Sequence, residues 1–153
     1  VIDEIEPLDP TSIRRVLLCS GKVFYDLLVN RNERVIDNVA IVRIEQLYPF
    51  PADELRRVLA KYPADAEIDW VQEESYNAGA WSFVEPRLRA ILGTERAVRY
   101  VGRDEGASPA TGSYKLHQHE LDQLLNEAFR KVTEAPAKQR RQHVGRGTST
   151  AAR

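Results

Sequence analysis

Short apolar runs alternate along the chain with segments in which apolar residues recur at helical spacing. Four runs have the length and apolar content of buried strands, at residues 14–20, 39–44, 67–72 and 97–102. Helices are expected from about residue 21, from residue 51, over residues 78–92 and over residues 115–130. Strands that alternate with helices predict an α/β fold with a mostly parallel sheet between layers of helices.

The two ends of the chain differ from this pattern. Residues 1–12 contain two prolines and several acids without a clear period, and we interpret them as an extended lead-in from a preceding domain. Residues 132–153 are basic and rich in Pro, Gln, Thr and Gly, and we expect them to be disordered. The predicted folded domain therefore covers residues 13–131. The absence of methionine favours an excerpt from a longer chain.

The bulk composition narrows the partners but identifies none. The chain has 153 residues, 42% of them hydrophobic, and a net charge of −1, which gives no reason to expect nucleic acid or an anionic membrane as a partner. No apolar run approaches the roughly 20 residues that cross a bilayer. The single cysteine, Cys19, lies in an apolar run and has no second cysteine to pair with. We expect a buried thiol, which suits a reducing compartment.

Candidate chemistry gathers where the predicted strands end, because ligands of open parallel sheets bind at the carboxyl edge. Ser20, Gly21 and Lys22 form a glycine turn that leads into a helix, where free N–H groups and a lysine favour a phosphate or carboxylate. The spacing is not that of a Walker loop. An ordinary turn with a solvated lysine is an equally good interpretation of the same residues.

Charged residues at the other strand ends carry weaker signals. Arg43 is placed to pair with Glu45 or with the adjacent acids Glu73 and Glu74, and a plain ion pair is the simpler interpretation. Neighbouring residues at a strand end point in different directions, so catalysis by the two acids is not expected.

Metal binding is not expected at the histidines. His117 and His119 stand two apart in a predicted helix and therefore lie on different faces.

Several ordered motifs resemble the C-terminal domain of 2-oxoglutarate dehydrogenase. They are CSGKVFYDLL (19–28), VAIVRIEQLYPFP (39–51), WVQEE (70–74), NAGAW (77–81), YVGR (100–103), ASPATG (107–112) and KLH (115–117). The resemblance spans residues 2–130 and therefore omits only the basic tail. It implies a transketolase C-terminal-like fold, with three α/β/α layers around a five-stranded sheet. One strand, for example an antiparallel edge strand, is then missing from the four predicted runs.

The resemblance also implies the reaction of the parent enzyme. That family decarboxylates 2-oxoglutarate on thiamine diphosphate with Mg²⁺ in the tricarboxylic acid cycle, and passes the succinyl group to dihydrolipoyl succinyltransferase. The cofactor and metal are held by the preceding domains of a homodimer. The Gly-Asp-Gly to Asn-Asn motif that binds them is not found in this sequence. We therefore expect no catalytic, cofactor-binding or metal-binding residue here, and the motif details resemble bacterial, cytoplasmic members more than mitochondrial ones.

The roles that the resemblance leaves for this chain are structural and regulatory. They include packing on the preceding domain, a share of the dimer contact, and part of an allosteric pocket for acetyl-CoA or a nucleotide. Ser20, Gly21, Lys22, Arg43 and Arg103 are the candidate residues for such an effector, since its phosphates need cations and free N–H groups.

Two other interpretations remain open on the sequence alone. The first is a stand-alone anion- or nucleotide-binding module, suggested by the Gly21 turn. The second is a scaffold or dimerisation domain that binds no ligand.

Overall fold

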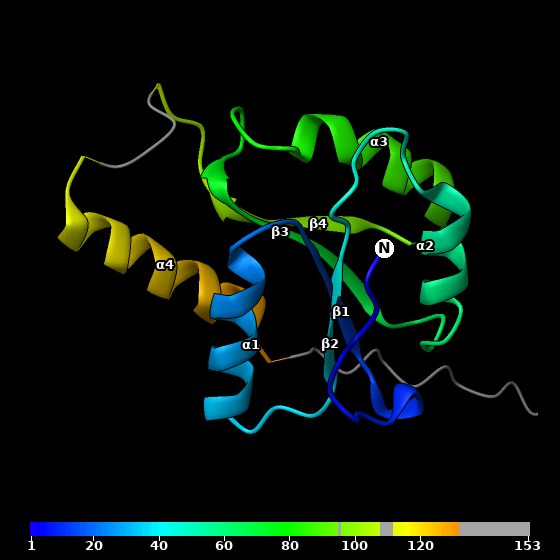
Figure 1. The fold of residues 1–153 in the computed structure, drawn as a ribbon. Helices are drawn as coiled ribbons and strands as arrows, with labels where there is room; N and C mark the ends of the chain where they lie inside the picture. Colours follow the sequence, from blue (N-terminus) through cyan, green and yellow to red (C-terminus); the bar gives the residue numbers. More distant parts are fainter. Residues whose placement is uncertain (95, 108–111, 132–153) are drawn as a thin grey trace, which may run out of the picture.

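The structure, a computed structural model, describes residues 1–94, 96–107 and 112–131. In these residues four parallel strands form one sheet with helices packed against both faces (Figure 1). The strands are β1 (Arg15–Cys19), β2 (Val39–Arg43), β3 (Glu67–Ser75) and β4 (Val98–Arg103). The helices are α1 (Val23–Glu33), α2 (Ala52–Leu59), α3 (Trp81–Leu92) and α4 (Tyr114–Ala128), after a short 3-10 helix at Pro10–Ser12. The tail at 132–153, expected to be disordered, lies outside the described residues.

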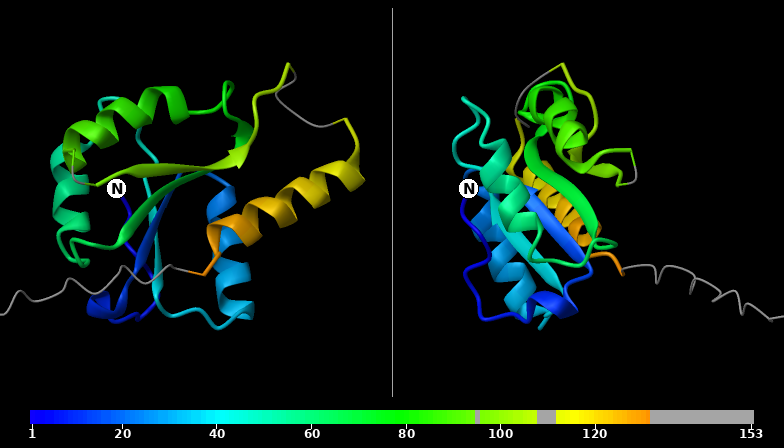
Figure 2. Two further views of the ribbon diagram at one scale, coloured as in Figure 1. Left: turned by 180° about the vertical axis from the view of Figure 1, so that it is seen from behind. Right: turned by 90° about the vertical axis from the view of Figure 1, so that its right-hand side faces the viewer.

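The molecule has three layers. The strand order across the sheet is β2-β1-β3-β4, with α1 and α4 on one face and α2 and α3 on the other (Figure 2). Successive residues of β1 face opposite layers: Leu17 packs with the α1 and α4 side, and Leu18 packs with the α2 and α3 side. Because both faces are covered, β1 is buried throughout, as its unbroken apolar run predicts. The predicted α/β/α architecture is confirmed.

Helix α3 begins three residues later than its apolar spacing predicts. The N–H groups of Ala78 and Gly79 donate to the carbonyl of Ser75, at 3.0 and 3.2 Å, so these residues form a turn. The buried amide of Gln72 then accepts the N–H of Trp81 at 3.0 Å and satisfies the start of the helix. A side chain outside the helix, that of Gln72, sets this boundary. The apolar periodicity of the helix does not reveal it.

The sheet has one strand fewer than the five that the resemblance implies, within the described residues. The edge of β2 is instead covered by the chain start, where Ile2 and Arg43 form a single antiparallel bridge. Only one residue pair has strand geometry there, so the expected antiparallel edge strand is not formed.

Buried charges lie at the opposite end of the sheet, under the end of α4. Asp69, near the start of β3, is only 1% exposed and contacts Arg130 at 2.6 Å and Arg15 at 3.5 Å. Arg15 also donates to the carbonyls of Ala128 and Arg130, at 2.9 and 2.8 Å. The acids that weaken the strand pattern of residues 67–72 thus belong to a paired network that ties the end of α4 to the sheet.

Candidate functional site

The strand order makes the carboxyl ends of β1 and β3 a topological switch point, and we call the region just beyond these two strand ends the crevice. The chain leaves β1 toward β2 and leaves β3 toward β4, on opposite sides of this point, and their following helices α1 and α3 cover opposite faces. Ligands of open α/β sheets bind at such a switch point, beyond the carboxyl ends of the strands. The chain leaves β1 at Ser20 and leaves β3 after Ser75, so two of the strand ends that the sequence suggested flank this point.

The loop after β1 presents a backbone donor at this crevice. Gly21 has φ 74°, a conformation in which glycine avoids the strain of a side chain, and the turn leads directly into α1. Its N–H donates to the Glu45 carboxylate at 3.3 Å. Ser20 is half-buried just before this turn. An anionic group of the protein itself therefore lies where the sequence predicts a phosphate or carboxylate.

Lys22 is held by two acids from different elements. Its ammonium lies 2.7 Å from Asp26 on α1 and 3.2 Å from Glu73 at the end of β3. The hydrogen bond to Asp26 is the main cause that raises the pKa of Lys22, and Glu73 adds to it. The side chain is 65% exposed, so both pairs are open to solvent and to exchange for an incoming anion. The lysine is thus charged and accessible at the crevice.

Arg43 at the end of β2 faces the same turn. Its guanidinium lies 4.1 Å above the Phe24 ring and 3.9 Å from a Glu45 oxygen. The predicted pairing with Glu45 is confirmed, whereas Glu73 pairs with Lys22 instead. The Nε atom of Arg43 is buried without a hydrogen-bond partner among the described residues. Arg43 therefore keeps donor capacity beside a carboxylate that it contacts only loosely.

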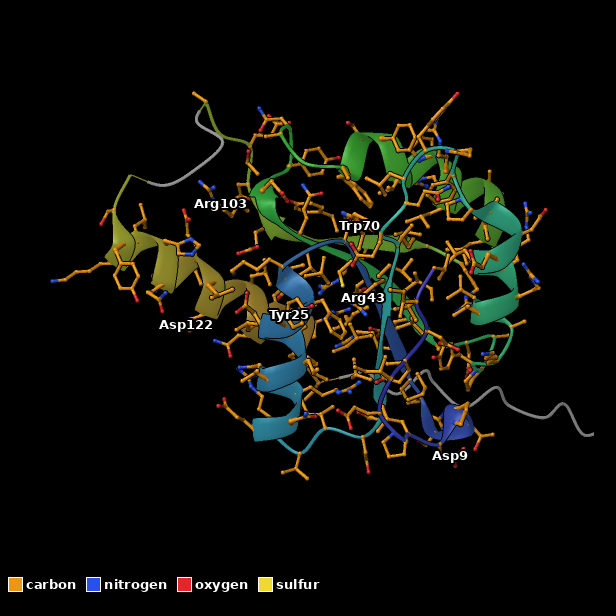
Figure 3. The ribbon with its side chains drawn as sticks, viewed as in Figure 1. Asp9, Tyr25, Arg43, Trp70, Arg103 and Asp122 are labelled. Atoms are coloured by element: carbon orange, nitrogen blue, oxygen red, sulfur yellow. The ribbon has the colours of Figure 1, made fainter. Side chains whose placement is uncertain are left out.

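Arg103 belongs to a neighbouring part of the carboxyl edge. It ion-pairs with Glu120 of α4 at 3.1 Å and lies at the end of the sheet, away from Arg43 (Figure 3). An open cavity of about 630 Å³ lies there between the end of β4 and α4, lined by Arg103 and by the acids Asp104, Glu105, Glu120 and Glu127, among others. The structure thus brings Ser20, Gly21, Lys22 and Arg43 together, while Arg103 pairs with Glu120 and meets this group through Glu73, with which it lines a small pocket.

The one cysteine is unsuited to nucleophilic chemistry. Cys19 is fully buried in the layer under α1, as expected. Burial, with a smaller effect from the Glu45 charge, raises its thiol pKa to about 12. The side chain is therefore a protonated core thiol at neutral pH.

The histidine helix shows no metal-binding geometry in the described residues. His117 lines a small pocket with Glu73, Arg103 and Glu120, but no three His, Cys, Asp or Glu side chains of the described residues converge as metal ligands. In the same ranges, no helix is long and apolar enough to cross a membrane.

Sequence reasoning missed two contributors to the crevice. Phe24 supports the Arg43 guanidinium, although its place at helical spacing indicated only a core residue. Glu45 was expected only as a partner of Arg43, yet it also accepts the Gly21 N–H. Both contacts could have been predicted from Arg43, Glu45 and the Gly21 turn if the ends of β1 and β2 had been known to be adjacent. That adjacency follows only from the strand order.

Comparisons with known proteins identify the family. The model of the 2-oxoglutarate dehydrogenase C-terminal family matches residues 1–129. The 2-oxoglutarate dehydrogenase E1 component of Coxiella burnetii is 47% identical over 131 residues, and that of Azotobacter vinelandii is 42% identical over 132 residues. These matches cover 84% of this chain but only 14% of each relative. The chain therefore belongs to the 2-oxoglutarate dehydrogenase C-terminal family.

Proposed function

We propose that this chain is the C-terminal domain of a 2-oxoglutarate dehydrogenase E1 component, with a structural and regulatory role. The identity of 47% to the Coxiella burnetii relative, spread over nearly the whole described fold, is the observation that carries this proposal. The parent enzyme would decarboxylate 2-oxoglutarate oxidatively and pass the succinyl group to the lipoyl arm of a dihydrolipoyl succinyltransferase. The bacterial relatives favour a bacterial cytoplasmic location.

The cofactor belongs to the rest of the enzyme in this proposal. Thiamine diphosphate, with Mg²⁺, supplies the carbanion chemistry of the decarboxylation when it is bound by the preceding domains. The cations at the crevice of this chain are each beside a carboxylate, and we assign them no place in the reaction itself. What this chain contributes is a rigid layer against which those domains pack.

Regulation is proposed at the crevice between β1 and β3. A phosphate of acetyl-CoA or AMP would accept the Gly21 N–H and pair with Lys22 and Arg43, as the Glu45 and Glu73 carboxylates do in this structure. Charge-assisted bonds of this kind are the strong ones. The geometry favours these residues as the core of the site and leaves Arg103, paired with Glu120, at its margin.

The test is calorimetric titration of the intact protein with acetyl-CoA, AMP and thiamine diphosphate. Lys22→Ala and Arg43→Ala should each weaken binding of acetyl-CoA or AMP by roughly tenfold or more, because each removes a charged hydrogen bond worth about 1.5–3 kcal/mol. Arg56→Ala removes the same charge from the exposed face of α2 and should leave the affinity unchanged. If all three variants bound acetyl-CoA and AMP as tightly as the parent protein, the proposed effector site would be refuted. The proposed place in the family would still stand.

Packing and dimer contacts form the second part of the proposal. Tyr25 and Val29 lie one turn apart on α1 and are 60% and 57% exposed. Apolar side chains so placed suit a contact with another domain or subunit. A stand-alone anion-binding module is not favoured, because the relatives that match are much longer chains.

A further inference from the structure

The first nine residues lie along the open edge of β2, and we call residues 1–9 the edge strap. Ile2 and Arg43 exchange two backbone hydrogen bonds of 2.8 Å each. The N–H of Ile41, two residues earlier on the same edge, donates to the Glu4 carboxylate at 2.8 Å. The carbonyl of Val39 accepts from Arg31 at 3.1 Å. The edge strap and one arginine thus satisfy outward-facing groups of β2 as a neighbouring strand would.

A buried ion pair fastens the edge strap to α1. Both oxygens of Glu4 contact Arg31, at 2.5 and 2.9 Å, and the two side chains are only 8% and 1% exposed. The pair is therefore bidentate and shielded from solvent, the geometry in which an ion pair is strongest. Asp3 adds a second attachment, since it accepts from Lys61 and Tyr62 at 2.6 Å each.

Polar contacts hold the edge strap more than apolar burial does. Ile2 and Ile5 are 38% and 54% exposed, while Val1 and Leu8 pack only partly against the core. An element with little buried apolar area opens at a lower free-energy cost than the core it rests on. Release of the strap would leave the Arg31 charge buried and unpaired, so the Glu4 contact controls whether the strap stays in place.

We propose that the edge strap is a latch for the end of β2. In the docked state Ile2 holds the backbone of Arg43, so the Glu4–Arg31 pair, two residues along the same strap, sets the position of a crevice residue. Displacement of the edge strap would free the outer edge of β2 from Ile41 to Arg43. The effect on anion binding rests on the proposed effector site, whereas the release of β2 does not.

The test is hydrogen exchange, followed by mass spectrometry, of the intact protein. Glu4→Gln should accelerate exchange in the peptide that covers β2 by tenfold or more, because a glutamine turns amide hydrogens toward Arg31. The peptide that covers β1 should exchange as in the parent. Glu6→Gln removes the same charge two residues along the strap and is the matched control. Unchanged exchange of β2 in the Glu4 variant would overturn the proposal.

Two further variants keep the test decisive if Glu4→Gln folds poorly. Glu4→Leu combined with Arg31→Met removes both charges, so no unpaired charge is left buried while the Ile41 N–H loses its acceptor. Ile2→Pro leaves the ion pair intact but removes the N–H that donates to Arg43. Both should speed exchange of β2 but not of β1, and protection equal to the parent in both would overturn the latch.

Titration of the same variants with acetyl-CoA separates the latch from the effector site. Weaker binding by several-fold in Glu4→Gln and Ile2→Pro supports the coupling to Arg43. Faster exchange of β2 with unchanged affinity overturns the coupling, provided that Lys22→Ala still weakens binding. If the parent binds no acetyl-CoA or AMP, the proposed effector site fails, and the exchange data alone decide the latch.

Discussion

Single buried charges in this domain depend on partners that are distant in the sequence. Asp69 of β3 contacts Arg130, which follows α4, and Arg15 on the neighbouring strand. From the sequence alone, Asp69 only weakens the strand pattern of residues 67–72. The partners become visible through the strand order, since β1 pairs directly with β3. The acid that interrupts the apolar pattern therefore stabilises the fold, because it pairs with both arginines.

Removal of the Asp69 carboxylate should therefore be costly. Asp69→Ala leaves Arg15 and Arg130 with less compensating charge in a buried site, and we expect a loss of about 3–5 kcal/mol in the free energy of unfolding. Asp53→Ala breaks an ion pair with Arg56 in which the aspartate side chain is 91% exposed, and it should cost less than about 1 kcal/mol. Urea unfolding of both variants measures the difference, and similar values would contradict this view of the network.

Because the Cys19 thiol is buried, the free energy of unfolding should decrease as the pH rises into the alkaline range. Its folded pKa of about 12 exceeds the value of about 8.5 expected in the unfolded chain. Protons therefore bind the folded state more strongly, and this contribution is complete below about pH 8.5 and is lost as the pH rises toward 12. Relative to Cys19→Ala, the parent should lose about 2 kcal/mol more stability between pH 7.5 and pH 10. Urea unfolding under reducing conditions measures this, and equal losses would show that the thiol ionises freely.

The helices and strands could be predicted from the periodicity of apolar residues, but some of their boundaries could not. The four strands and the helix faces follow from apolar runs and spacing. The start of α3 depends on the Gln72 side chain, which accepts from the Trp70 indole and the Trp81 N–H and donates to the Ser75 carbonyl. Gly79 lies against this amide, and a β-carbon there would collide with it. Neither relation has a local signature in the sequence.

This packing gives a prediction for the turn before α3. Gly79→Ala should displace Gln72 and destabilise the protein by about 1–3 kcal/mol, because a methyl group is forced into filled space. Gly112→Ala adds the same group where nothing lies within 4 Å and should be nearly neutral. Thermal unfolding of the two variants provides the comparison. A Gly79 variant as stable as the Gly112 variant would mean that Gln72 does not occupy this position.

At the scale of the whole molecule, the layers were predictable and the crevice was not. Alternating strands and helices are sufficient to predict a parallel sheet with two covered faces. Which loops meet depends on the order β2-β1-β3-β4, which no local pattern encodes. The sequence therefore placed Ser20, Gly21, Lys22, Arg43 and Arg103 in one group. The structure keeps the first four together at the β1 and β3 switch point, and pairs Arg103 with α4.

The contact between Arg15 and the end of α4 links β1 to a helix that follows much later in the chain. Arg15 of the first strand donates to carbonyls at residues 128 and 130, more than a hundred positions later. On a ribosome, where chains emerge from the N-terminus, the first strand is made early but cannot complete its bonds until those carbonyls have left the tunnel. The domain should therefore stay open to chaperones until residue 130 has left the tunnel, and a chain that stops before residue 128 would leave the buried Arg15 without both of its carbonyl partners.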